Sequence, residues 1–233
     1  MNLRIFDSPG DLARATARAI LQRTAHGGPS VIGISGGSTP RPLYELLGGE
    51  HRPALAERSI TWVLVDERYV PLDDPQSNSA MIRSTLFRDG IPPGHRLLDF
   101  DTTHDDASES VLEFEERWRA LGLSTLDAAI LGVGEDGHTA SLFPGTPVLD
   151  VQDRIAAAVY VPRLEQWRVT LTMPVIRSAA LRLVMVAGES KAAIVRDVAA
   201  AVDHPVARAT TSPAGETWWL VDRAAASITT APG

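Results

Sequence analysis

The sequence predicts an α/β fold in which a mostly parallel sheet is covered by helices on both faces. Short apolar runs of strand length alternate with amphipathic runs of helix length over nearly the whole chain. This alternation is typical of β-α-β units, whose crossover helices leave the strands parallel. Several of the strand-like runs are followed at once by polar or glycine-rich segments, as strands are when they end at a binding edge.

The helices are predicted from capping residues and from the spacing of apolar side chains. Ser8, Pro9 and Asp11 form a helix start, with a serine cap, a proline in the first turn and an acid at the positive end. That helix should run to about Thr24. Apolar residues recur every three or four positions over residues 107–121, which indicates an amphipathic helix. The other expected helices span residues 41–47, 77–87, 174–180 and 191–202.

The strands are predicted from short runs rich in apolar and β-branched residues between turn signals. We expect residues 99–106, an acidic stretch, to form a solvated loop and a helix start. The expected strands span residues 31–34, 60–65, 126–131, 155–161, 168–172, 181–187 and 218–221.

Composition limits the classes of function. The chain has 233 residues without a linker, repeat or low-complexity segment, so we expect a single domain over residues 1–233. Its 22 basic and 29 acidic residues give a net charge of −7, which argues against a nucleic-acid partner. The absence of cysteine excludes disulfides and thiolate chemistry and fits a cytoplasmic protein. No run resembles a signal peptide or a membrane span, and we expect a monomer without a membrane partner.

The segment of residues 132–145 is the strongest candidate for a catalytic loop. It follows the expected strand 126–131 and holds four glycines, the carboxylates Glu135 and Asp136, and His138. A neutral imidazole can take a proton from water near pH 7 and return it to a leaving group. The alternative is a strand-to-helix turn in which His138 only caps or packs.

Four polar or glycine-rich segments that follow expected strands should meet at one edge of the sheet. They are residues 35–39, 66–68, 134–138 and 188–191, and each directly follows an expected strand. If the strands are parallel, all four lie outside their carboxyl ends, where open α/β sheets bind ligands.

Residues 35–39 suit a phosphate group, because glycines expose backbone N–H groups, hydroxyls add donors and a helix start adds partial positive charge. The segment matches neither a dinucleotide-binding pattern nor a P-loop. A tight turn with capping residues is the alternative. Lys191 could supply a countercharge or be an exposed lysine, and spacing alone favours a surface position for Arg168.

A serine nucleophile and a metal site are the alternatives to a histidine base. Residues 33–37 match the G-x-S-x-G nucleophile elbow, but only about one strand precedes Ser35 and the fold of that motif places several. We therefore expect water, rather than Ser35, to be the nucleophile. None of the six histidines is paired at helical ligand spacing, so we predict no metal site. His104 is more simply explained as part of a helix cap.

Several motifs together resemble the 6-phosphogluconolactonases. They are Gly-Ile-Ser-Gly-Gly-Ser-Thr-Pro at residues 33–40, Val-Asp-Glu-Arg-Tyr-Val-Pro at residues 65–71 with Ser-Asn at residues 77–78, and Gly-Val-Gly-Glu-Asp-Gly-His-Thr-Ala-Ser-Leu-Phe-Pro at residues 132–144. Residues 168–172 and 188–192 are similar to later motifs of that family. The motifs occur in order over most of the chain, and the third is the most specific.

The resemblance implies hydrolysis of 6-phospho-D-glucono-1,5-lactone in the pentose phosphate pathway, without a metal or organic cofactor. It implies a three-layer, Rossmann-like α/β/α fold shared with glucosamine-6-phosphate deaminase. Carried onto this chain, it implies that His138 is the general base. Asp66 and Arg68 would line the sugar end. In catalysis, Asp136 would orient the imidazole or cap a helix, and Arg68 is a candidate donor to the oxyanion. The implied substrate-binding residues are Ser35, Gly36, Gly37, Ser38, Thr39, Asp66, Arg168 and Lys191.

Two rival functions share the fold. The deaminases usually carry tyrosine where this chain has Arg68, and a glutamate shortly after the histidine, where it has Leu142 and Phe143. These departures favour the lactonase. A sugar-phosphate-sensing domain that binds without chemistry is the second rival. Such sensors usually come with a DNA-binding helix-turn-helix, which this acidic chain does not offer.

Overall fold

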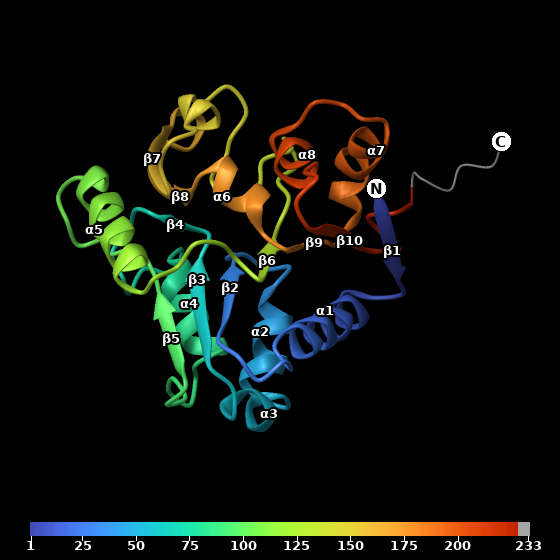
Figure 1. Cartoon of the computed structure of the whole chain (residues 1–233). Helices are drawn as coiled ribbons and strands as arrows, with labels where there is room; N and C mark the ends of the chain where they lie inside the picture. Colours follow the sequence, from blue (N-terminus) through green and yellow to red (C-terminus); the bar gives the residue numbers. More distant parts are fainter. Residues whose placement is uncertain (228–233) are drawn as a thin grey trace.

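A seven-stranded parallel sheet forms the centre of the molecule (Figure 1). The computed structural model describes residues 1–227, so the last six residues of the expected domain lie outside the described residues. The strand order is β1-β10-β9-β6-β2-β3-β5, and every neighbouring pair is parallel. The strands are β1 (Asn2–Phe6), β2 (Ser30–Ile34), β3 (Ile60–Leu64), β5 (His95–Leu98), β6 (Ala128–Leu131), β9 (Leu181–Val186) and β10 (Glu216–Asp222).

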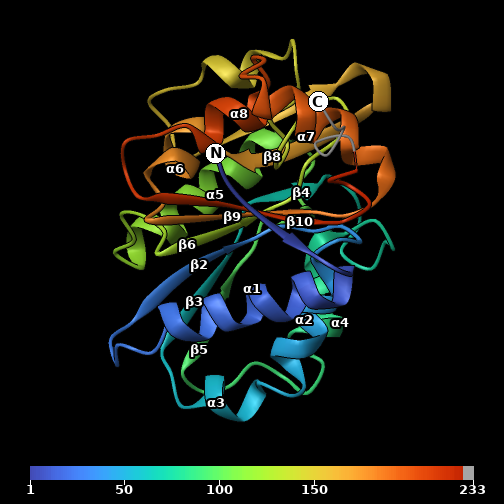
Figure 2. The ribbon, with the colours of Figure 1, turned by 90° about the vertical axis from the view of Figure 1, so that its right-hand side faces the viewer.

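Helices cover both faces of this sheet, which confirms the predicted α/β architecture (Figure 2). One face carries α1 (Pro9–Arg23), α2 (Arg41–Gly48), α3 (Arg52–Ala56) and α4 (Asn78–Thr85). The other face carries α5 (Ala107–Ala120), α6 (Met173–Ser178), α7 (Ala192–Ala199) and α8 (Pro205–Thr210). The predicted cap of α1 is present, since Ser8 Oγ accepts from the backbone N–H of Asp11 at 3.1 Å.

A second, antiparallel sheet was not foreseen. It has the order β4-β8-β7, from β4 (Asp66–Arg68), β7 (Ala156–Val161) and β8 (Gln166–Leu171). We expected β7 and β8 as strands of the alternating pattern and residues 66–68 only as the end of a strand. The physical reason is the connection: the short 3₁₀ turn η2 (Pro162–Leu164) can join antiparallel neighbours but not a parallel crossover.

Other differences concern short elements. The strands β1 and β5 and the helices α3 and α8 were not predicted; β1 and β5 are the two edges of the main sheet, and α3 and α8 have five and six residues. The expectation that Asp99 is solvated was also wrong. The Asp99 carboxylate is buried and contacts Ser79 at 2.6 Å and Arg83 at 2.7 Å. Asp106 does cap α5, accepting from Ser108 N at 2.7 Å.

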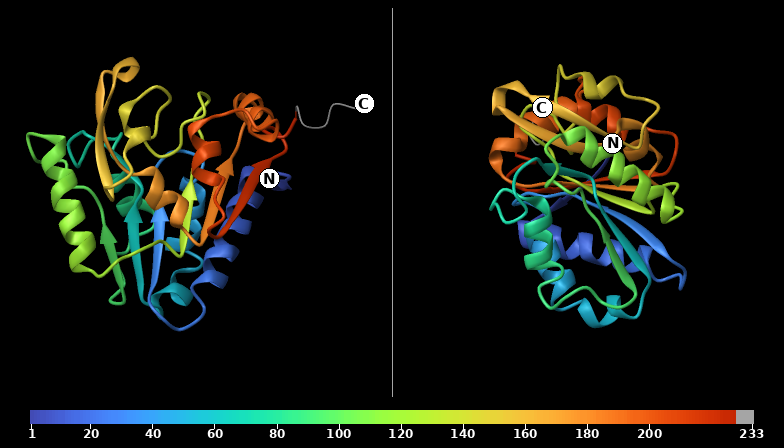
Figure 3. Two further views of the ribbon diagram at one scale, coloured as in Figure 1. Left: turned by 45° about the horizontal axis from the view of Figure 1, so that its top comes forward. Right: turned by 90° about the vertical axis from the view of Figure 1, so that its left-hand side faces the viewer.

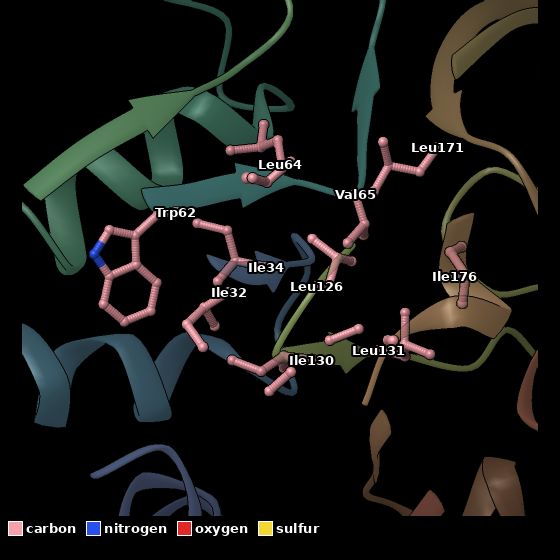
Figure 4. Close-up of a cluster of buried hydrophobic side chains, with 14 of the residues drawn as sticks. Ile32, Ile34, Trp62, Leu64, Val65, Leu126, Ile130, Leu131, Leu171 and Ile176 are labelled. Carbon is pink, nitrogen blue, oxygen red and sulfur yellow. The ribbon is translucent and has the colours of Figure 1, made fainter. Parts of the chain in front are cut away.

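A continuous apolar core fixes the strands in position (Figure 4). Ile32 and Ile34 on β2 and Trp62 on β3, two strands of the central sheet, are fully buried in this core. Val65 and Leu171, also fully buried, join the main sheet to the second one. Because such interiors are close-packed, the loops that leave these strands begin from fixed points.

The carboxyl ends of the main strands face one edge of the molecule, and the β7–β8 hairpin stands above that edge (Figure 3). Among the described residues, three 3₁₀ turns lie in the connections that follow β6, β7 and β9: η1 (Pro147–Asp150), η2 and η3 (Glu189–Lys191). Within residues 1–227, no helix has the length and apolar character needed to cross a membrane.

Candidate active site

A cavity of about 370 Å³ at the carboxyl edge brings the four predicted segments together. A pocket of this size suits a small ligand. Every candidate site residue of the sequence analysis lines it except Asp136, which stands behind His138. The candidate residues in the lining are Ser35, Gly36, Gly37, Ser38, Thr39, Asp66, Arg68, His138, Arg168 and Lys191.

The loop after β6 folds tightly around His138. The backbone N–H of Gly134 donates to the carbonyl of His138 at 2.8 Å, and that of Gly137 donates to the carbonyl of Gly134 at 3.0 Å. A Cβ on Gly134 would lie 2.0 Å from His138 Nδ1 and 2.5 Å from Asp136 Oδ1. Glycine is therefore required there for the imidazole to lie against the backbone.

Asp136 is hydrogen-bonded to the imidazole of His138, with Oδ1 and Nδ1 2.5 Å apart, and accepts the His138 backbone N–H at 3.2 Å. Its other oxygen, Oδ2, accepts from Arg163. Burial by itself raises the pKa of Asp136, but the hydrogen bond and charge of His138, with Arg163, outweigh it and lower that pKa to about 2. An ionised carboxylate can only accept, so Nδ1 carries the proton and Nε2 is the nitrogen available as a base.

Phe143 supports the imidazole from one side. Its ring centroid lies 4.2 Å from that of His138, with a tilt of 31°. Leu142 and Phe143 are both buried, so the positions just after the histidine loop present apolar surface rather than a carboxylate.

Arg168 is buried, which corrects the expectation of a surface position drawn from its spacing. It stands opposite Arg68 in the antiparallel register of β4 and β8. Burial and the neighbouring Arg68 lower the pKa of Arg168 to about 10, so the Arg168 guanidinium is charged at neutral pH. Within residues 1–227, neither side chain pairs with a carboxylate, nor does Lys191. Neighbouring unpaired cations are unfavourable unless an anion joins them.

Unpartnered polar atoms gather at this cavity. Five buried side-chain polar atoms of the described chain have no hydrogen-bond partner, and three of them belong to residues that line it: Ser35 Oγ, Asn78 Oδ1 and Arg168 Nε. A buried polar atom without a partner is costly, so native proteins rarely keep one without a reason. That three of the five belong to residues of the cavity lining points to a site for a polar ligand.

Comparisons with known proteins agree with this geometry. Residues 7–219 match the family described as glucosamine-6-phosphate isomerases/6-phosphogluconolactonase. The chain belongs to this family. The 6-phosphogluconolactonase of Rattus norvegicus is 31% identical over 242 residues, covering 99% of this chain and 94% of the rat protein.

Solved structures of the isomerase/lactonase family have the same fold. The crystal structure of 6-phosphogluconolactonase from Leishmania guyanensis aligns with a TM-score of 0.85 and 27% identity over 99% of each chain. A monomeric glucosamine-6-phosphate deaminase aligns with a TM-score of 0.82 and 24% identity over 98% of this chain and all of that one. The fold predicted from the resemblance, shared with the deaminases, is therefore confirmed.

Asn78 lines the cavity and Glu67 holds it there, and neither was among the residues predicted from the sequence. Glu67 is fully buried and accepts the backbone N–H groups of Arg68, Asn78 and Ser79, each at 2.7 Å. Burial raises its pKa to about 7 against these hydrogen bonds. The contacts hold Asn78 at the cavity, so close to Gly36 that a Cβ on that glycine would lie 1.7 Å from Asn78 Oδ1. The Ser-Asn pair at residues 77–78 was the available sequence signal.

Asp66 is fixed rather than free. Its Oδ2 accepts from Ser141 Oγ at 2.7 Å, and its backbone carbonyl accepts from Asn78 Nδ2 at 2.9 Å. Ser141 and Arg163, which also line the cavity, had no place among the predicted residues. Arg163 lies at the tip of the β7–β8 hairpin, whose approach to the loop of residues 132–145 is a tertiary contact.

The geometry does not provide a serine nucleophile. Ser35 Oγ has no hydrogen-bond partner among the described residues, whereas an activated serine needs a base within hydrogen-bond reach. Tyr44 donates to the carbonyl of Ser35 at 2.7 Å, which fixes the backbone at this position.

One group of side chains in residues 1–227 could hold a metal ion, with ligand atoms within 4.8 Å of one another: Asp101, His104 and Glu113. It does not line the cavity. His104 Nε2 already lies 2.8 Å from Glu113 Oε2, and Asp101 Oδ1 accepts from Thr103 Oγ1 at 2.6 Å. These contacts account for the group as part of the turn that leads into α5.

Proposed function

We propose that this protein hydrolyses 6-phospho-D-glucono-1,5-lactone to 6-phospho-D-gluconate, the second step of the pentose phosphate pathway. The observation that carries the proposal is the cavity that combines a carboxylate-bound histidine with unpaired Arg68, Arg168 and Lys191. A phosphorylated lactone needs both parts: a base for the carbonyl carbon and cations for the phosphate. The 6-phosphogluconolactonase names of its relatives support the same substrate.

His138 acts as the general base in this proposal. Nε2 removes a proton from a water molecule as the water oxygen attacks C1 of the lactone, and the carbonyl π electrons move to the oxygen. Asp136 holds the imidazole in the Nδ1–H tautomer and stabilises the imidazolium that forms. When the tetrahedral intermediate collapses, the bond from C1 to the ring oxygen breaks and the imidazolium protonates that oxygen.

The oxyanion of the intermediate needs donors that are in place before the attack. Arg68 and the backbone N–H groups of the glycine loops are the candidates. Arg168, Lys191 and the loop of residues 35–39 would hold the phosphate, and Asp66 would contact the sugar. A phosphate held away from C1 positions the lactone for attack. No metal or organic cofactor takes part in these steps, and we propose a single-domain monomer acting in the cytoplasm.

Glucosamine-6-phosphate deamination is the second candidate because the fold is shared. The buried Leu142 and Phe143 speak against it, since they occupy the positions where the deaminases usually carry the glutamate of their acid–base relay. Non-catalytic sugar-phosphate binding is disfavoured by the hydrogen-bonded His138 and Asp136 at the cavity.

The direct test is to give purified protein fresh 6-phosphogluconolactone and to follow acid release. The proposal predicts a rate far above spontaneous hydrolysis, unchanged after dialysis against a chelator. A rate equal to the spontaneous one would contradict it. Ammonia release from glucosamine 6-phosphate at roughly 1 s⁻¹ or faster would favour the deaminase instead.

A further inference from the structure

Arg163 links the β7–β8 hairpin to the loop that carries His138. It lies in η2, between the two strands of the hairpin, and its guanidinium forms an ion pair with Asp136, 27 residues earlier in the chain. The same guanidinium stands over the ring of Phe143, with its carbon 5.1 Å from the ring centroid.

These contacts complete a ring of four side chains, each in contact with two of the others. Asp136 binds His138 through Oδ1 and Arg163 through Oδ2, while Phe143 lies against both His138 and Arg163. A carboxylate held at both oxygens cannot rotate about its last bond without losing a partner. The orientation of the imidazole therefore depends on a residue of the second sheet.

Stability alone does not account for this ion pair. The Arg163 side chain is 55% exposed and that of Asp136 is 30% exposed, and ion pairs of this kind contribute little to folding. The pair instead restrains the orientation of the Asp136 carboxylate, which is hydrogen-bonded to His138.

We propose that Arg163 is a positioning residue, which fixes the Asp136 carboxylate so that its Oδ1 faces His138 Nδ1. The inference rests on the proposed function, because it matters for catalysis only if His138 is the base. It makes the tip of the β7–β8 hairpin part of the catalytic apparatus.

The competing explanation is direct phosphate binding, since Arg163 lines the cavity. The two explanations differ in which substrates are affected. Arg163 acting through Asp136 influences proton transfer, which phosphorylated and unphosphorylated lactones share. Arg163 acting on the phosphate affects the phosphorylated lactone alone. Arg68, Arg168 and Lys191 line the same cavity without a carboxylate partner in the described chain, so a phosphate has other cations available.

A double-mutant cycle separates these explanations. Arg163→Met should lower kcat about tenfold on both 6-phosphogluconolactone and gluconolactone, with KM little changed. In the Asp136→Asn background the same change should have no further effect, because the carboxylate it acts on is gone. Arg163→Lys should restore part of the rate. Arg208→Met is the matched control: Arg208 is 49% exposed, pairs with Asp203 and lies outside this cavity, so kcat should stay at the parental value.

A second readout does not depend on turnover. The Nδ1–H proton of a histidine bonded to a carboxylate gives a low-field NMR signal while the bond protects it from exchange. We expect that signal from His138 in the parent and in Arg163→Lys, a weakened or exchange-broadened signal in Arg163→Met, and none in Asp136→Asn. His138→Ala identifies the signal.

Three results would overturn the inference: a loss confined to the phosphorylated lactone, a loss that persists in Asp136→Asn, or an NMR signal in Arg163→Met that is as sharp as in the parent. Failure of the proposed function looks different. In that case the parent would hydrolyse the lactone no faster than the spontaneous reaction, or His138→Ala would keep the parental rate, while the NMR signal would still report whether Arg163 orders Asp136.

Discussion

Two buried arginines differ in their hydrogen bonds: one lies where a strand of the main sheet begins, and the other lies in the second sheet, over the carboxyl edge. Arg182, near the start of β9, is fully buried, and its guanidinium donates to Thr217 Oγ1 at 2.9 Å and to the carbonyls of Arg177, Ala179 and Ala214, each at 2.7 Å. Arg168, at the carboxyl edge, keeps an unpartnered Nε and faces Arg68.

Two histidines repeat the contrast. His95, at the start of β5, is buried with both ring nitrogens engaged: Nδ1 accepts from Trp62 Nε1 at 3.1 Å, and Nε2 lies 2.9 Å from the carbonyl of Leu55. His138 is half-buried, and only its Nδ1 has a partner in the described chain. Arg182 and His95, where strands begin, are satisfied by other parts of the chain and serve the fold. Arg168 and His138, at the carboxyl edge, each keep a nitrogen without a partner in the described chain.

The largest expected effect is the loss of catalysis when His138, at the carboxyl edge, is replaced. His138→Ala should lower kcat by roughly 10²–10⁴, the usual contribution of a general base, and should leave KM and Tm close to the parental values. Initial rates of acid release and a thermal melt measure the three quantities. A near-parental kcat would mean that the loop of residues 132–145 is only a turn.

Arg182→Met should show the reverse pattern. It removes the donor to three carbonyls, that of Ala179 buried and those of Arg177 and Ala214 part-buried, which should cost about 3 kcal/mol of stability and lower Tm by roughly 6–12 °C. The kcat of the folded fraction should not change, because Arg182 does not line the cavity. Denaturant titration gives the stability, and a loss of kcat at unchanged Tm would break the proposed contrast between the two arginines.

The smallest effect concerns pH. Burial lowers the pKa of His95, because protonation would remove the acceptor for Trp62 and charge a buried ring. Below the ordinary value of about 6.5 the unfolded chain therefore binds more protons at this site than the folded chain does, and stability falls as the pH falls. Denaturant midpoints between pH 7 and pH 5 should decrease more for the parent than for His95→Gln. Parallel curves would show that His95 does not contribute to the acid sensitivity.

The carboxyl edge was predictable from sequence because it follows from local patterns. Apolar runs ending in glycine or polar segments located β2, β3, β6 and β9, and the parallel arrangement then brought Ser35, Asp66, His138 and Lys191 to one edge. The caps and periodicity of α1 and α5 were equally local signals.

What escaped prediction depends on contacts between distant segments. The burial of Arg168 results from the pairing of β4 with β8, two strands far apart in the sequence. Arg163 reaches Asp136 only because the β7–β8 hairpin stands over the carboxyl edge. Asp99 was expected to be solvated because its neighbours are acidic, but Ser79 and Arg83 on α4 bury it.

The most direct test of the contrast between Arg168 and Arg182 is to replace Arg168, whose Nε has no partner in the described chain, and to compare two substrates. Arg168→Met should lower kcat/KM for 6-phosphogluconolactone by roughly 10–100-fold, mainly through KM, while kcat/KM for unphosphorylated gluconolactone stays near the parental value. Because the substitution removes a buried charge without a partner, Tm should equal or exceed that of the parent. Equal losses on both lactones, or a fall in Tm like that of Arg182→Met, would contradict the account and make Arg168 a structural residue.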